Sequence, residues 1–168
     1  MYILGNVAYG LWVVSFGTIA DSFTLMVANH SASLLKFIGL QTTVVPSTIV
    51  ANASLMIDGN VVVNVYEGCN AINVSILFIA FLFAYKGSLK RTLAFSLVGL
   101  ISIYLFNLLR VNGLFLVALY FPNHLYLMHK FVFTGVIYAF VFGLWFIWVT
   151  KVNHRVHKED TENLEKKT

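Results

Sequence analysis

Charged residues are scarce in this chain: they make up 11% of its 168 residues, against 59% hydrophobic residues. Soluble domains carry about 25% charged residues, so too few polar side chains remain here to cover a water-soluble globule. A single cysteine excludes a secreted scaffold held by disulfides. The low polarity also excludes a disordered chain and a cytoplasmic enzyme domain, and it indicates one domain embedded in a membrane.

Four apolar stretches are candidate membrane spans, because roughly 20 apolar residues are needed to cross the hydrocarbon core of a bilayer. They cover residues 2–20, 71–85, 92–109 and 131–150. The last stretch is rich in aromatic residues and contains Trp145 and Trp148 near its end, which suits a membrane interface. We therefore predict an all-α polytopic membrane protein with about four transmembrane helices, forming a single integral membrane domain over residues 1–152.

The positions of the basic residues predict the orientation. Three of them (Lys86, Lys90 and Arg91) lie between the second and third spans, and five follow from Lys151 onward, which makes eight of the 11 Lys and Arg residues. By the positive-inside rule both segments are cytoplasmic, and four spans then place both chain termini in the cytoplasm. The polar cytoplasmic tail, residues 153–168, is expected to be solvated and disordered.

Two segments on the opposite, outer side are expected to have structure of their own. Residues 21–40 carry apolar residues at helical spacing, which predicts an amphipathic helix at the membrane interface with Asp21 or Ser22 as its cap. Further along, an Asp58-Gly59 pair separates two apolar runs rich in β-branched residues. This pattern predicts a small extracytoplasmic β-hairpin.

Residues 111–128 form a third outer segment. They are apolar but are broken by Pro122. A fifth span in this position would move the basic tail to the outside, so we expect this segment to be re-entrant or interfacial.

Three side chains that can carry chemistry fall at one depth in this topology, and ionisable residues at a membrane edge are functional candidates by default. Cys69 is expected at the outer start of the second span, Arg110 at the outer end of the third and His129 at the outer start of the fourth. Each has a structural alternative: a buried small hydrophobe, a side chain snorkelling to headgroups and an interfacial anchor beside Lys130. Together they favour nucleophilic catalysis. His124, in a predicted loop, is the alternative histidine.

The chemistry follows from these residue types. Cys69 comes directly after Glu67-Gly68 at a helix amino terminus, where the positive end of the helix dipole favours a thiolate. His129 would accept the thiol proton, and Arg110 would stabilise the thiolate or the oxyanion of a tetrahedral intermediate. The sequence has no Gly-rich phosphate loop, paired acidic metal site or Cys/His zinc spacing, so no metal and no cofactor are expected.

The segments around these side chains resemble the exosortase/archaeosortase family of polytopic, transpeptidase-like membrane proteins. The similarity is greatest to the compact F-type exosortases of bacteria with two membranes. It rests on VYEGCNAI (residues 65–72), NLLRV (107–111) and HKF (129–131), each at the edge of an apolar helix. One departure follows the cysteine, where Asn70-Ala71 stands in place of the commoner Ser-Gly.

This resemblance implies that Cys69, Arg110 and His129 are the catalytic residues. It implies cleavage of exported proteins at a carboxy-terminal signal made of a short motif, a hydrophobic helix and a basic cluster. The reaction would run through a Cys69 thioester on the periplasmic face of the inner membrane. Exported substrates and the lipid bilayer are the expected partners, nucleic acid is not, and a small membrane partner is left open.

Two other functions remain open at this point. The main alternative is a non-enzymatic membrane assembly factor or lipid-binding subunit, in which Arg110 would bind lipid. A transporter is disfavoured, because no predicted span carries a charge at mid-depth.

Overall fold

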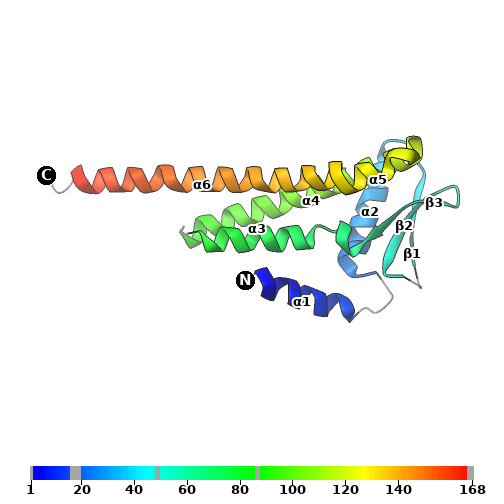
Figure 1. Cartoon of the computed structure of the whole chain (residues 1–168), viewed down its shortest axis with the longest axis horizontal. Helices are drawn as coiled ribbons and strands as arrows, with labels where there is room; N and C mark the ends of the chain where they lie inside the picture. Colours follow the sequence, from blue (N-terminus) through cyan, green and yellow to red (C-terminus); the bar gives the residue numbers. More distant parts are fainter. Residues whose placement is uncertain (1, 16–19, 48–49, 86–87, 166–168) are drawn as a thin grey trace.

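The structure, a computed structural model, describes residues 2–15, 20–47, 50–85 and 88–165, the last 14 of these by their backbone alone. Four helices lie roughly along one axis: α1 (Tyr2–Val14), α3 (Ile72–Ala84), α4 (Leu89–Tyr120) and α6 (Thr134–Glu165). A head formed by α2 (Ser22–Phe37) and a three-stranded sheet lies at one end of this helix bundle (Figure 1).

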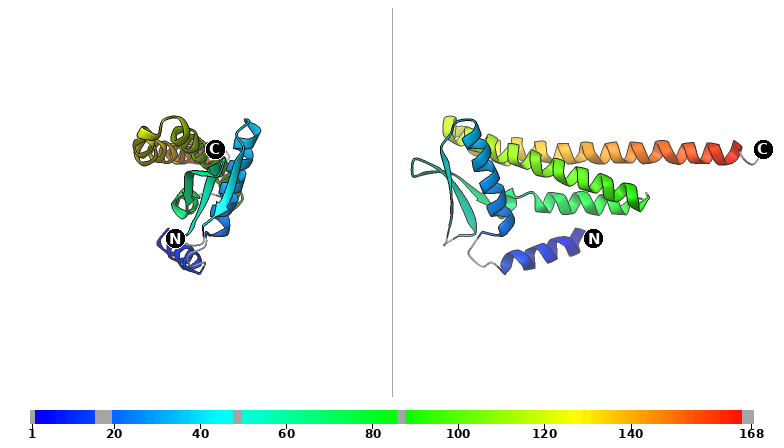
Figure 2. Two further views of the ribbon diagram at one scale, coloured as in Figure 1. Left: turned by 90° about the vertical axis from the view of Figure 1, so that its right-hand side faces the viewer. Right: turned by 180° about the vertical axis from the view of Figure 1, so that it is seen from behind.

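The end of α6, the start of α1, the end of α3 and the start of α4 all point away from the head (Figures 1 and 2). The predicted topology requires this arrangement, because it puts both termini and the basic turn on one side of the membrane. The side of the membrane on which the head lies stays a prediction.

Two of the described helical segments are apolar and long enough to cross a membrane, Leu89–Tyr120 and Pro122–Lys151. Helices α1 and α3 are apolar too, but each has 13 residues. At 1.5 Å per residue they are about 20 Å long, shorter than the roughly 30 Å hydrocarbon core. The protein is therefore a mostly helical chain with two membrane-capable helices, and the count of four spans stays a prediction. Residues 16–19 of the predicted first span lie outside the described residues.

The head contains an antiparallel sheet of β1 (Thr42–Pro46), β2 (Asn52–Ile57) and β3 (Asn60–Tyr66), in the order β1-β2-β3. The predicted hairpin is confirmed as β2 and β3. Its turn holds Asp58 at φ 49° and Gly59 at φ 79°. Two successive positive φ angles give a two-residue connection the twist that paired strands need. Strand β1 was not predicted, because it is short and ends in a proline.

Helix α2 begins where the sequence predicts. The carboxylate of Asp21 accepts hydrogen bonds from the backbone N–H groups of Phe23 (2.9 Å) and Thr24 (3.0 Å). These bonds satisfy two of the donors that every helix start leaves free, and they identify Asp21 rather than Ser22 as the cap. The helix runs across the direction of α3, α4 and α6 and packs on the sheet (Figures 1 and 2).

Helix α4 corrects the predicted end of the third span. It continues without a break from Leu89 to Tyr120, so Arg110 lies inside the helix rather than at its end. Residues 111–120 contain no proline, and the helix ends only before Pro122, whose ring disfavours continuation. The part of the 111–128 segment beyond α4 forms short turns: η2 (Pro122–His124), α5 (Leu125–Leu127) and the π-helical turn η3 (Met128–Phe133).

The carboxy-terminal segment also differs from its prediction. The backbone of α6 stays helical to Glu165, whereas residues 153–168 were expected to be disordered. The residues from Lys151 onward include neither glycine nor proline, so no residue type in this segment interrupts a helix that is already formed.

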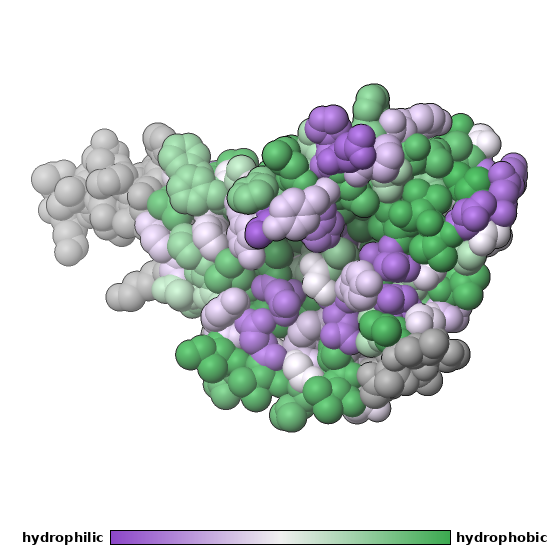
Figure 3. All heavy atoms as spheres, turned by 45° about the vertical axis from the view of Figure 1, so that its right-hand side comes forward, coloured by the Kyte–Doolittle hydropathy of each residue, from purple (hydrophilic) through white to green (hydrophobic). Residues whose placement is uncertain are grey.

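The buried residues form two clusters, one in the head and one in the helix bundle. The head cluster joins Leu35 of α2, Leu55 of β2 and Phe115 of α4, and it includes Cys69. The bundle cluster joins α3, α4 and α6 through buried residues such as Phe78 and Ile137. Because α4 contributes to both clusters, the part of this helix nearest the head forms one wall of the head. On the surface of the head, hydrophilic and hydrophobic residues are interspersed (Figure 3).

Candidate active site

Cys69 lies where the head meets the helix bundle. Strand β3 leads directly into the single 3-10 turn η1 (Glu67–Cys69), and α3 begins at Ile72. The side chain of Cys69 is 8% exposed and packs in the same cluster as Val65 of β3 and Val111 of α4. The thiol is therefore packed between the strand that directly precedes it and a helix that is distant from it in sequence.

The two residues after Cys69 shape the turn into α3. The side-chain oxygen of Asn70 accepts a hydrogen bond of 3.0 Å from the backbone N–H of Ile72, which satisfies one of the donors that the start of α3 leaves free. Ala71 has a φ of 62°, in the left-handed region that glycine adopts without strain. The resemblance noted in the sequence has glycine, rather than alanine, in the commoner pattern at this position.

His129 contacts Cys69. Its Nε2 atom lies 3.8 Å from the Sγ atom of Cys69, although 60 residues separate the two in sequence. The imidazole is carried by η3, and the backbone carbonyl of His129 accepts a hydrogen bond of 2.9 Å from Oγ1 of Thr134. The predicted meeting of these two side chains is thus present in the geometry of the fold. His124 lies in η2 and is exposed.

Arg110 is buried beside this pair, with 8% of its surface exposed. Its Nε–H group has no hydrogen-bond partner among the described residues. Its positive charge acts on the imidazole of His129. A buried guanidinium with an unpaired donor is costly, so a charged residue kept at this position is a candidate for a functional role.

Asn107 was not predicted from the sequence to have a role in the site. Its Nδ2 donates a hydrogen bond of 2.7 Å to the backbone carbonyl of Cys69, and its side chain is completely buried. Asn107 and Arg110 are three residues apart on α4, so they lie on the same face of that helix. This spacing was the signal that could have identified Asn107 as a positioning residue.

A second polar cluster lies on the other side of η1. Asn70 donates from Nδ2 to the hydroxyl oxygens of Tyr9 (2.6 Å) and Thr24 (3.3 Å), and the Thr24 hydroxyl in turn bonds to the buried carboxylate of Asp21. The pKa of Glu67 is raised from its ordinary value of 4.5, first by burial and then by the negative charge of Asp21. The cluster ties α1, α2 and the Cys69 turn together.

A family model described as transmembrane exosortase matches residues 3–149, which is most of the chain. The chain belongs to the transmembrane exosortase family. No curated protein and no solved structure matches it. Membership agrees with the resemblance seen in the sequence and is consistent with a membrane transpeptidase or protease.

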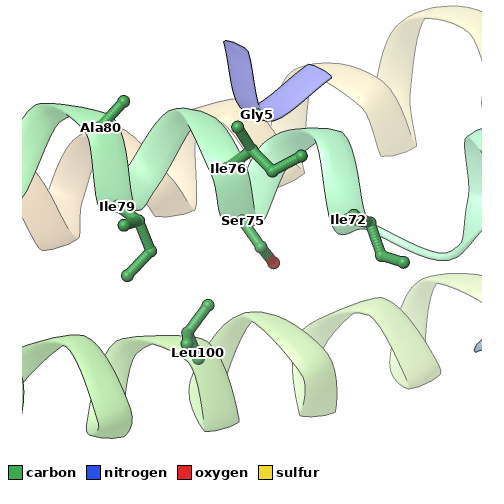
Figure 4. A pocket seen from close by; sticks show the side chains of 7 residues that line it. All are labelled: Gly5, Ile72, Ser75, Ile76, Ile79, Ala80 and Leu100. Carbon is green, nitrogen blue, oxygen red and sulfur yellow. The ribbon is translucent and has the colours of Figure 1, made fainter. Parts of the chain in front are cut away.

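One cavity of this exosortase carries little chemistry. It has a volume of about 300 Å³ and lies between α1, α3 and α4 (Figure 4). Its lining is apolar apart from Ser75, whose hydroxyl already donates to the carbonyl of Ala71 at 2.9 Å. Among the described residues, no three His, Cys, Asp or Glu side chains gather as metal ligands would. Among the described residues, the Cys69–His129 pair is therefore the candidate site for covalent chemistry.

Proposed function

We propose that this protein is a membrane-embedded cysteine protease or transpeptidase of the compact F type, with Cys69 as nucleophile. The observation that carries the proposal is the 3.8 Å separation between Sγ of Cys69 and Nε2 of His129, next to the buried Arg110. A thiol and an imidazole in contact are the two groups that nucleophilic catalysis needs, and a third, cationic group can stabilise the charge that develops.

The first half of the reaction forms a thioester. His129 accepts the proton of the Cys69 thiol, and the thiolate attacks the carbonyl carbon of a substrate peptide bond. Arg110, whose guanidinium is buried beside the pair, donates to the resulting oxyanion. The tetrahedral intermediate then collapses: the C–N bond breaks, protonated His129 gives its proton to the leaving amine, and the acyl group stays on Cys69.

The second half releases the acyl group. An amine of an acceptor molecule, or water, attacks the thioester carbonyl while His129 accepts its proton. The C–S bond breaks, and the proton returns to the sulfur of Cys69. The proposed substrates are exported proteins with a carboxy-terminal signal, and the proposed location is the periplasmic face of the bacterial inner membrane.

Replacement of the nucleophile tests the activity. In cells that carry Cys69→Ala in place of the native protein, exported proteins should retain their carboxy-terminal signal, as read by mass spectrometry of their carboxy-terminal peptides. The variant itself should still accumulate in the membrane. Ser102→Ala on α4, which removes an exposed hydroxyl bonded to its own helix, is the matched control and should leave processing unchanged. Normal processing with Cys69→Ala would instead favour an assembly or lipid-binding role.

Labelling of introduced cysteines tests the location. In a Cys69→Ala background the chain has no other thiol, so single cysteines can be placed at Asp58 in the hairpin turn and at Lys90 near the start of α4. A membrane-impermeant maleimide added to spheroplasts should label the cysteine at position 58. It should label the cysteine at position 90 only after the membrane is permeabilised, and the reverse pattern would contradict the proposed orientation.

A further inference from the structure

Strand β3 borders a groove that leads to the catalytic pair. The groove has a volume of about 520 Å³ and is lined by β3, α4, α5 and η3, with Val62 and Tyr66 on the strand side and Leu114 on the opposite side. His129 is among the residues that line it. The same imidazole contacts Cys69, so a ligand in the groove lies beside the side chain that touches the thiol. The volume is in the range of pockets that hold ligands in proteins.

The strand that forms this border has a free edge. In the order β1-β2-β3, strand β3 pairs with β2 on one side only. Among the described residues, no backbone hydrogen bond joins β3 to an element other than β2. An edge strand of this kind presents unused N–H and C=O groups along its length, and an extended peptide is the ligand that satisfies them.

Chain continuity connects that edge to the nucleophile. β3 ends at Tyr66, and Cys69 follows at the end of the next turn. A peptide laid along the strand would therefore have one end close to the turn that carries the thiol. The groove beside it can accept side chains, because successive residues of an extended peptide point to opposite faces.

We propose that β3 binds the substrate as an added strand, with substrate side chains in the groove between β3 and α4 and the scissile bond delivered to Cys69. This inference rests on the proposed function, since it assumes a peptide substrate. An acyl chain of a lipid is the competing occupant, and it has no use for the backbone groups of the strand edge.

The test measures peptide binding through the reactivity of Cys69 in the full-length protein in detergent micelles. The probe is an acetylated Val-Thr-Val-Thr-Val peptide with a carboxy-terminal cysteamine 2-pyridyl disulfide. The Cys69 thiolate attacks the cysteamine sulfur, the probe's disulfide breaks, a mixed disulfide forms and pyridine-2-thione leaves. The control probe has alternate backbone amides N-methylated, which removes the donors that strand pairing needs.

Strand binding predicts that the first probe reacts roughly tenfold faster than the methylated one, the expected effect of a few lost hydrogen bonds. Val62→Trp, which fills the groove, should abolish this preference. Val61→Trp is the matched control, because Val61 is the neighbouring residue of the strand, is 52% exposed and does not line the groove. Methyl methanethiosulfonate should modify Cys69 at the same rate in all three proteins, which checks that each variant is folded.

Equal rates for the two peptides in the native protein would overturn strand binding, as would equal loss of preference in both variants. The proposed function is read separately, from processing by the Cys69→Ala variant. Peptide preference without any dependence of processing on Cys69 would overturn the enzymatic proposal and leave peptide binding by β3 supported. Processing that depends on Cys69, without peptide preference, would overturn strand binding alone.

Discussion

Asn107 of α4 holds the backbone of Cys69 in place through a 2.7 Å hydrogen bond from its Nδ2 to the Cys69 carbonyl. The bond joins a membrane-capable helix to the turn that carries the proposed nucleophile. Since Asn107 is fully buried, water cannot replace it as a donor if the side chain is changed.

Asn107→Asp keeps the shape of the side chain but removes this donor. We expect substrate processing to fall roughly 10- to 100-fold, because a small displacement of the nucleophile is costly for a reaction that depends on its position. Asn112→Asp is the control, since Asn112 also donates to a backbone carbonyl, that of Leu108, but does so away from Cys69. Processing and the amount of protein in the membrane are measured together; equal losses for both variants at equal amounts would contradict a positioning role.

His129→Gln should lower processing by about 10²- to 10⁴-fold, the usual contribution of a general acid–base group. His124→Gln should have little effect, because His124 is exposed in η2 while His129 contacts the thiol. The measurement is the fraction of exported substrate that keeps its signal at steady state. A larger loss with His124→Gln would show that the imidazole had been assigned to the wrong residue.

Arg110→Lys should lower processing by about 10²- to 10³-fold, as the loss of one oxyanion donor does elsewhere. The lysine keeps the charge but lacks the planar fork of donors, so charge alone does not rescue it. Arg91→Lys, at an exposed site near the start of α4, is the matched control. Full activity of the Arg110→Lys variant would mean that only the positive charge is needed at this position.

Gly99→Ala should destabilise the helix bundle by about 1–3 kcal/mol, the cost of overpacking a filled core. A β-carbon at Gly99 of α4 would overlap the buried ring of Phe78 on α3. Gly143→Ala on α6 meets open space and should stabilise the helix by about 1 kcal/mol, because alanine is the better helix former. Thermal unfolding in detergent should therefore move in opposite directions, and a shift of the same sign in both would contradict the close packing of α3 on α4.

Glu67→Gln should change how stability depends on pH. Because the folded protein raises the pKa of Glu67 above 4.5, the folded state binds this proton more tightly than the unfolded state, and stability falls as the pH rises upward from about 4.5. The glutamine variant lacks this loss. Unfolding temperatures of the two proteins should converge at low pH and separate, with the variant more stable, as the pH increases. A constant difference across the range would contradict the raised pKa.

Local patterns predicted those parts of the fold that are specified by neighbouring residues. Asp58-Gly59 between apolar runs is sufficient for a hairpin, and Asp21 before a helical pattern is sufficient for a cap. The meeting of Cys69 and His129 could be predicted because topology alone brings their helix ends together. The predicted meeting of these two side chains does not depend on the length of any helix.

The parts that were missed depend on contacts between distant elements. Leu108 and Phe115 of α4 are buried against the head, and this tertiary packing, invisible in a hydropathy pattern, extends the helix beyond the predicted Leu109. Strand β1 is held by its pairing with β2 rather than by its own sequence. The role of Asn107 likewise appears only when the carbonyl of Cys69 is brought to it.

The π-helical turn η3 has one more consequence. Its i+5 bonding accommodates one residue more than an α-helical turn, so the helix that follows is rotated relative to the segment before it. His129 can thus face the thiol while Ile137 and Val141 of α6 face α3 and α4. The direction in which His129 points is therefore set independently of the face that α6 packs against the other helices. Deletion of a single residue within this turn would therefore preserve either the contact of His129 with the thiol or the packing of α6 on α3 and α4, but not both.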